Sequence, residues 1–147
     1  MSSVQSKDFE YLEHTADAKF RAYGKNLGQA FENAALAMLN VMVETGSVTN
    51  SSSVEVEISS PDMDSLLFDW LSEILFLFEV EEMVFGAVKV NEMDIGEDEC
   101  SLSATLYGET IDHSIHVFDT EVKAATYNDM KIEKTDDGWM IQATVDT

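Results

Sequence analysis

The stretch LLFDWLSEILFLFE, residues 66–79, decides the fold class, because apolar side chains cover most of its circumference when it is wound as a helix. Such a helix must be covered on more than one side, so we expect residues 62–80 to form the central core element, packed against sheet on at least two flanks. Pro61 suits a first helical turn, with Ser60 as its cap. The expected core residues on this helix are Trp70, Leu71 and Ile74.

The rest of the chain predicts one more helix and mainly antiparallel sheet. The helix should begin near Asn26, a good N-cap, with Gln29 as its capping-box partner. An acidic turn region is expected at 91–99. Alternation of apolar and polar residues predicts strands around 9–13, 18–22, 54–58, 84–90, 102–108, 122–126, 130–132 and 139–145. The whole chain, 1–147, is therefore expected to be a single α+β domain.

The charge balance is extreme for a chain of 147 residues. Asp and Glu number 29 and Lys and Arg 8, which gives a formal net charge of −21 at pH 7. Such a surface repels phosphate backbones, so direct binding to nucleic acid or to an anionic membrane is not expected. It suits a basic protein partner or bound cations. The alternative is that the charge only keeps the protein soluble. Cys100 is the one cysteine, and no leader-like segment opens the chain, so we expect a soluble, cytoplasmic protein.

The segment HTADAKF, residues 14–20, places Asp17 where an alternating strand begins. Asp146 stands at the end of the last strand, and the carboxylate of Thr147 follows it directly. If the two strands are neighbours, these oxygens converge and suit a hard cation such as Ca²⁺ or Mg²⁺. The alternative is that the two aspartates are simply solvated at strand ends.

A zinc site is a weaker possibility. His113 and His116 have a spacing that suits zinc, and Cys100 or His14 could complete the ligand set. No second paired-ligand motif accompanies them, so solvated loop histidines are the better explanation.

Lys123 lies on the polar side of a strand-like segment, with Val122, Ala124 and Thr126 on the opposite side. In so acidic a chain, its simplest role is a local ion pair with Glu121 or another acid. The sequence contains no glycine-rich phosphate loop, nucleophile elbow or paired-histidine helix. Physical reasoning from the residues therefore stops at an acidic domain with a candidate cation site.

Several motifs, in order along almost the whole chain, resemble the archease family. They are EHTADAKFRAYGKNLGQAFENAA (13–35), LLFDWLSEILFLFE (66–79), LYGE (106–109), TEVKAATYNDMKIEK (120–134) and WMIQATVDT (139–147). Two departures are local: Gly28 stands in a helical turn where an acid is more usual, and DHSIH lacks a proline that often follows the aspartate.

The resemblance implies a function. Archeases are protein cofactors of the RtcB-type RNA ligase, which joins tRNA halves after intron removal, and they are not ligases themselves. They promote guanylylation of the ligase's histidine, support multiple turnover and broaden the nucleotide that the ligase accepts. The resemblance maps a calcium site onto Asp17, Asp146 and Thr147, and it marks Lys123 as a functional residue. It also implies sheets that enclose two helices.

Two other functions remain as alternatives. One is a metal-dependent enzyme that uses Asp17, Asp146 and Lys123, and a deep pocket around these residues would favour it. The other is a chaperone-like acidic scaffold, which an exposed apolar patch of several hundred Å² would favour.

Overall fold

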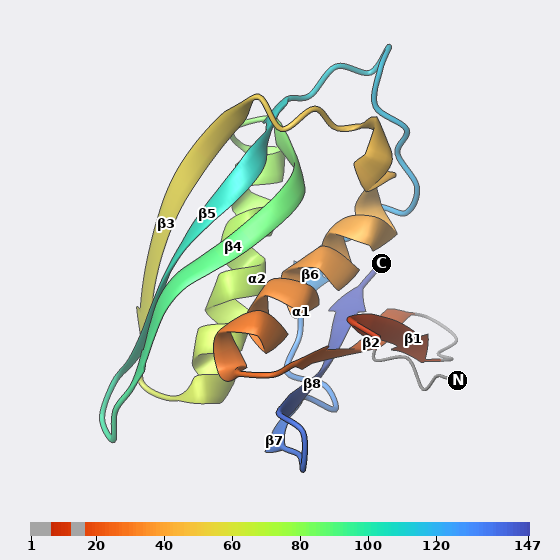
Figure 1. Ribbon diagram of the computed structural model, residues 1–147. Coiled ribbons are helices and arrows are strands. Elements are labelled where there is room, and N and C mark those ends of the chain that lie inside the picture. The colour runs from red at the N-terminus through yellow and green to blue at the C-terminus, as the bar shows by residue number, and fades with distance from the viewer. Residues whose placement is uncertain (1–6, 13–16) are drawn as a thin grey trace.

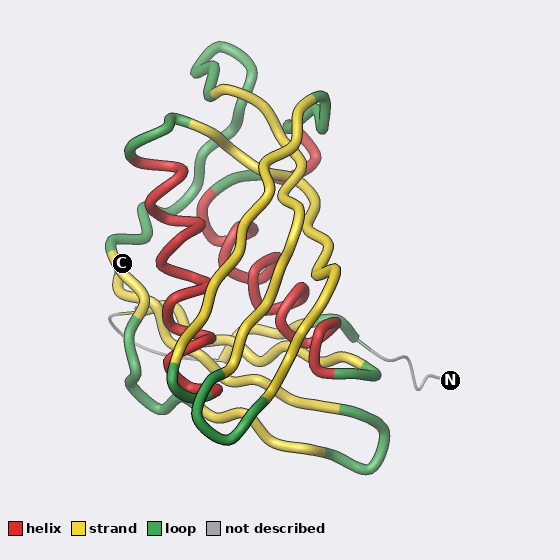
Figure 2. The backbone as a smooth tube through the Cα atoms, turned by 90° about the vertical axis from the view of Figure 1, so that its left-hand side faces the viewer, coloured by secondary structure: helices red, strands yellow, loops and turns green. Residues whose placement is uncertain are grey.

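The computed structural model describes residues 7–12 and 17–147 and has the predicted α+β architecture, in which two antiparallel sheets enclose two helices (Figure 1). The three-stranded sheet has the order β3 (Ser52–Ser60), β5 (Cys100–Thr110), β4 (Met83–Ile95). The other sheet runs β1 (Phe9–Leu12), β2 (Asp17–Gly24), β8 (Trp139–Asp146), β6 (Ala124–Ala125), and β7 (Lys131–Lys134) also pairs with β8. Figure 2 shows the strands of the three-stranded sheet running side by side in front of the helices.

Helix α1 (Leu27–Met42) begins at the predicted cap. The Asn26 side-chain oxygen accepts a hydrogen bond from the backbone N–H of Gln29 at 2.9 Å. The Gln29 side chain in turn accepts from the backbone N–H of Lys25, also at 2.9 Å. The first bond satisfies a donor that the first helical turn would otherwise leave unpaired. The second differs from a standard capping box, because Gln29 accepts from the residue before the cap and not from Asn26 itself. The apolar face of α1 packs against β2, β8 and β4, so the helix is held by both sheets.

Helix α2 (Met63–Glu79) is the core element that its sequence predicts. The expected core residues are at most 1% exposed: Trp70, Leu71 and Ile74. The indole N–H of Trp70 donates to the backbone carbonyl of Phe31 at 3.0 Å, which joins the two helices. Strands of both sheets contact α2, so the prediction that it is covered on more than one side is confirmed.

The cap of α2 differs from the prediction. Asp62, not Ser60, is the N-cap, and its carboxylate accepts from the backbone N–H of Ser65 at 2.8 Å. This bond lowers the pKa of the Asp62 carboxyl group. Ser60 is still paired in β3, and its hydroxyl donates to Asp69 at 2.6 Å and does not cap the helix. Pro61 therefore precedes the cap and lies outside the first helical turn. A charged oxygen beyond the end of the strand is the stronger acceptor for a helix N-terminus.

The acidic turn expected at 91–99 is shorter than predicted. Strand β4 continues to Ile95, and the turn proper is closed by a bond of 2.9 Å from the Gly96 N–H to the Glu99 carbonyl. Glu92 and Asp94 are exposed on this strand, so their charges stay in water while the backbone keeps its pairing with β5.

Strand β5 also runs past Gly108, where we expected it to end, and reaches Thr110. A Cβ atom at Gly108 would lie 1.9 Å from the Val84 carbonyl oxygen. The glycine therefore allows a close approach of β4 beside the register shift between Phe85 and Ala87, and it does not terminate the strand.

Strand β8 is the centre of the second sheet. It pairs with β2 along its whole length on one edge, and with β6 and β7 on the other. Its alternate residues Ile141, Ala143 and Val145 are completely buried in the core. Gln142 and Thr144, on the opposite face, are at most 3% exposed, so β8 is covered on both sides.

The strand expected over 122–126 is reduced to Ala124–Ala125. Val122 is buried as predicted, but Ala124 is exposed and Ala125 is buried, the reverse of the predicted alternation. A two-residue strand cannot sustain a period of two, so the flanking loops set which side chains face inward. No helix in the described ranges is long and apolar enough to cross a membrane.

Candidate functional site

Asp17 and Asp146 lie directly opposite each other on neighbouring strands. Asp17 opens β2 and Asp146 closes β8, and the two are partners in the antiparallel register. Directly opposed residues point to the same face of a sheet, with Cβ atoms about 4.5–5.5 Å apart. Asp146 is exposed and Asp17 is half-buried. The structure therefore brings these two predicted site residues together at one end of the five-stranded sheet.

Lys123 reaches the same place through its backbone. Its N–H donates to the Asp146 carbonyl oxygen at 2.7 Å, and the following residue, Ala124, is the register partner of Asp146 on β6. The Lys123 side chain is exposed, and within 7–12 and 17–147 its ammonium forms no ion pair with Glu121. Thr147 follows Asp146 directly. We call Asp17, Lys123, Asp146 and Thr147 the strand-end site.

Residues 126–130 cover the polar face of β8 next to the strand-end site. The Thr126 hydroxyl donates to the Thr144 carbonyl at 2.7 Å, and the Gln142 amide donates to the Asp129 carbonyl at 2.8 Å. The Asp129 carboxylate also pairs with the Lys19 ammonium at 3.0 Å.

The same covering segment is held from its other side by an aromatic contact. The ring of Tyr127 stacks on that of Phe68 from α2, with centroids 4.4 Å apart and planes 4° from parallel. Asp129 has a φ of 53°, a left-handed conformation that aspartate tolerates better than most residues. Side-chain and main-chain contacts together fix residues 126–130, the segment that follows Lys123 along the chain.

A polar strip continues along β2 away from the strand-end site. The Arg21 guanidinium donates to the Gln142 side chain at 2.9 Å. Beyond it, the Tyr23 hydroxyl hydrogen-bonds to Glu10, and this bond lowers the pKa of the Glu10 carboxyl group. The pKa of the Tyr23 phenol is raised, first by burial and then by the same bond. The basic side chains Lys19 and Arg21 are thus engaged with polar partners of the same sheet face.

The donor set of the strand-end site fits a hard cation. Two carboxylates lie opposite each other, Thr147 follows Asp146, and the buried Thr144 hydroxyl on the same strand has no hydrogen-bond partner among the described residues. All of these atoms are oxygens, which Ca²⁺ and Mg²⁺ prefer. In the described part of the chain, no three His, Cys, Asp or Glu side chains are grouped closely enough to hold a metal. A cation here would therefore need oxygens of Thr147, of the backbone or of water as well.

The alternative zinc set does not assemble from the described residues. Cys100 begins β5, whereas His113 and His116 follow the other end of that strand. His14 lies outside the described residues. His113 is exposed, as expected of a solvated loop histidine.

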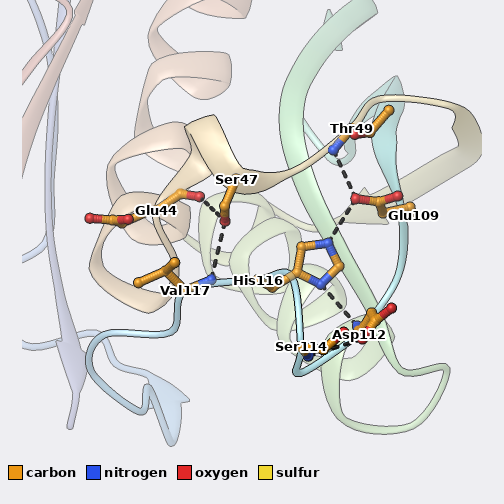
Figure 3. A network of polar contacts seen from close by, with 8 residues as sticks. All are labelled: Glu44, Ser47, Thr49, Glu109, Asp112, Ser114, His116 and Val117. Atoms are coloured by element: carbon orange, nitrogen blue, oxygen red, sulfur yellow. Dashed lines mark hydrogen bonds and ion pairs between the residues drawn. The ribbon is translucent and has the colours of Figure 1, made fainter.

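The prediction of a solvated loop histidine is wrong for His116. This residue is 5% exposed and is bonded through both ring nitrogens (Figure 3). Its Nδ1 accepts from the backbone N–H of Asp112 at 2.9 Å, and its Nε2 lies 2.7 Å from the Glu109 carboxylate. The Nδ1 bond assigns the ring proton to Nε2, which donates to Glu109. The bond from His116 is the main cause that lowers the pKa of the Glu109 carboxyl group, and a bond from the Thr49 backbone N–H is the second. His116 therefore fastens a loop, and the chain's i, i+4 spacing of Asp112 and His116 was the available signal.

Two surface clefts lie away from the strand-end site. The larger, about 810 Å³, is next to Trp139, between the start of α1 and the turn before β8. The smaller, about 300 Å³, lies on the three-stranded sheet next to Ser103. Neither is lined by Asp17, Lys123 or Asp146.

Comparison with known proteins gives a consistent result over nearly the whole chain. Residues 9–147 match the Archease protein family (MTH1598/TM1083). Protein archease of Methanosarcina acetivorans is 54% identical over 142 residues, which cover 97% of this chain and 97% of that protein. Protein archease of Pyrococcus furiosus is 40% identical over 141 residues, covering 95% and 99%.

Solved structures agree with the sequence comparison. The solution structure of Methanobacterium thermoautotrophicum protein 1598 has a TM-score of 0.81 at 39% identity, covering 95% of this chain and 99% of that one. The crystal structure of an archease, possible chaperone, from Thermotoga maritima has a TM-score of 0.55 at 19% identity, covering 92% and 94%, and shows a likeness of fold alone. With a family match over 139 residues and relatives at 40–54% identity, this chain belongs to the archease family.

Proposed function

We propose that this protein is a non-catalytic activator of an RtcB-type RNA ligase in tRNA splicing, promoting guanylylation, multiple turnover and broader nucleotide use. Membership of the archease family supports this proposal. The observation that carries it is the meeting of Asp17, Asp146 and the Lys123 backbone on adjacent strands. These three residues are separated along the chain, and the fold joins them at one end of the five-stranded sheet.

The charge of the protein determines how it can act on such a ligase. Guanylylation brings a nucleoside triphosphate, divalent cations and a histidine nucleophile together, so it depends on charge neutralisation and alignment. A protein with a net charge of −21 repels the triphosphate. It is attracted instead to a basic nucleotide- and RNA-binding surface, with association that salt weakens. We therefore place its action at the mouth of the ligase site, through transient docking.

Calcium is the cation that we propose for the strand-end site. Asp17, Asp146 and the carboxylate of Thr147 would hold it, and Lys123 would lie beside it as a charged contact for the ligase. When bound, the cation supplies a positive charge that acidic oxygens can share across a protein–protein contact. The protein's own residues would hold that charge at a strand end and present Lys123 next to it, so that docking and cation delivery use one surface.

A guanylylation assay with matched variants tests the proposal. The cognate ligase is incubated with labelled GTP and this protein, with single-turnover and multiple-turnover ligation measured in parallel. We expect Asp17→Asn, Asp146→Asn and Lys123→Ala to abolish stimulation while circular dichroism shows a native fold. The controls Glu57→Gln and Lys89→Ala make the same charge changes at exposed positions of the three-stranded sheet, and they should stimulate as wild type does. If all three strand-end variants stimulate fully, the proposed working surface is wrong.

The metal-dependent enzyme remains a weaker alternative, because neither of the two surface clefts described above includes the strand-end residues. A chaperone-like role has one specific observation in its favour. Phe76 lies in the last turn of α2, and Val80 directly follows the helix. Their side chains are 50% and 57% exposed. Suppression of the aggregation of an unfolding client, weakened by Phe76→Ser, would support this second function; no suppression by wild type would exclude it.

A further inference from the structure

Thr144 has a property that the fold alone does not explain. It is 1% exposed, and its Oγ1 is the one buried side-chain oxygen or nitrogen in the described part of the chain without a hydrogen-bond partner. Buried hydroxyl groups in proteins are normally bonded, and an exception calls for a reason such as a bound ion or a functional role. The sequence held no signal for this residue, since a threonine in a strand is ordinary.

The position of Thr144 connects it to the strand-end site. Thr144 and Asp146 are alternate residues of β8, so their side chains point to the same face, with Cα atoms about 7 Å apart. Asp17, the register partner of Asp146, lies diagonally across from Thr144 on β2. The orphan hydroxyl therefore shares a sheet face with both carboxylates.

The neighbours of Thr144 on that face are engaged elsewhere. The residue directly opposite it is Lys19, whose ammonium pairs with Asp129 at 3.0 Å. Thr126 donates its hydroxyl proton to the Thr144 backbone carbonyl and not to the side chain. Gln142, the neighbour of Thr144 on the other side along this face, is bonded to Arg21 and to the Asp129 carbonyl. Among the described residues, the acceptors next to Thr144 toward the end of the strand are the carboxylates of Asp17 and Asp146.

We propose that Thr144 is a positioning residue of the strand-end site, whose hydroxyl donates a hydrogen bond to one of the paired carboxylates when a divalent cation is bound. The inference rests on the cation site of the proposed function. Without a cation, two opposed carboxylates repel and splay apart. A cation draws them together, and a carboxylate that binds a metal through one oxygen keeps acceptor capacity on the other. Metal-ligating carboxylates are commonly hydrogen-bonded in this way, which fixes their orientation.

Calorimetric titration of the full-length protein with Ca²⁺ tests the inference without any ligase. Thr144→Val keeps the side chain's shape and removes the hydroxyl, and we expect it to weaken calcium affinity about 10–100-fold, the usual effect of removing such a partner. Thr144→Ser retains the hydroxyl and should restore most of the affinity. Thr105→Val is the matched control: this threonine is 7% exposed on the other sheet, bonded to Glu55, and should leave calcium affinity unchanged.

A thermal readout separates the proposed role from a purely structural one. In calcium-free buffer, Thr144→Val should melt at or above the wild-type temperature, because it removes an unpaired buried hydroxyl. In saturating calcium, the melting temperature of Thr144→Val should rise less than that of wild type. Wild-type affinity in Thr144→Val, with affinity lost in Asp17→Asn, would overturn the inference, as would a wild type that binds no calcium. If wild type and the Thr144 variants bind calcium as expected but wild type does not stimulate the ligase, the proposed function is refuted and the role of Thr144 stands.

Discussion

Because two carboxylates of the strand-end site are opposed, we predict that the effect of one substitution on stability changes sign when calcium is added. Asp146→Asn removes a like charge directly opposite Asp17. Favourable pairs that are directly opposed on adjacent strands contribute about 0.2–1 kcal/mol each, and opposed like charges are destabilising. Coulomb's law in water gives a similar figure, about 0.8 kcal/mol at about 5 Å. Without calcium, the variant should therefore be more stable than wild type by up to about 1 kcal/mol, a rise in Tm of about 2–4 °C for a chain of this size.

Calcium should reverse this order. A ligand at about 100 times its Kd stabilises the native state by about 2.7 kcal/mol, which exceeds the relief of repulsion. Wild type should gain that stability, and Asp146→Asn should gain much less, so the two melting curves exchange places. Differential scanning calorimetry with EDTA and with Ca²⁺ measures both effects.

Glu57→Gln is the matched control for this experiment, because its register partner is the uncharged Ser103. It should melt like wild type under both conditions, apart from the small effect of net charge. If Asp146→Asn lowers the Tm in EDTA and gains as much from Ca²⁺ as wild type, the two aspartates neither repel nor share a cation, and the reasoning fails.

Three further predictions concern other parts of the molecule. Trp70→Ala empties the centre of the core and removes the indole bond to α1, and denaturant unfolding should show a loss of about 3–5 kcal/mol. Lys19→Met breaks the ion pair with Asp129, in which the two side chains are 18% and 57% exposed, so the loss of stability should be about 1 kcal/mol or less. It should nevertheless weaken ligase stimulation, because it loosens the segment that follows Lys123. Glu109 has a folded-state pKa below its ordinary value of 4.5, chiefly because of its bond to His116, so its stabilising effect is present above that pH and is lost as the pH falls through the folded pKa. Acid titration followed by circular dichroism should show a shallower loss of stability below about pH 4.5 in Glu109→Gln than in wild type.

Patterns with a regular period could be predicted from the sequence. The all-round apolar segment 66–79 identified the central helix, because no other arrangement buries so many adjacent large side chains. The cap at Asn26 was readable because both partners, Asn26 and Gln29, lie within one turn. Asp17 and Asp146 were placed at strand ends by alternation alone, and the antiparallel register observed between β2 and β8 makes them direct partners.

What the sequence did not indicate depends on contacts between distant segments. The burial of His116 follows from Glu109 and the loop around Thr49, which approach only in the folded chain. The inward face of Ala125 is set by the loops that flank a two-residue strand, not by its own alternation. The sequence marks Thr144 as an ordinary strand residue, and only the folded structure shows that its hydroxyl is buried without a hydrogen-bond partner among the described residues.

Guanylylation of the cognate RtcB-type ligase, measured with and without this protein, tests the central claim most directly. The account predicts that wild type raises the rate and allows many ligation turnovers per ligase, that added salt weakens the effect, and that Asp17→Asn, Asp146→Asn and Lys123→Ala lose it while remaining folded. Equal guanylylation and turnover in the presence and absence of the wild-type protein, at low salt and with Ca²⁺ supplied, would contradict the account.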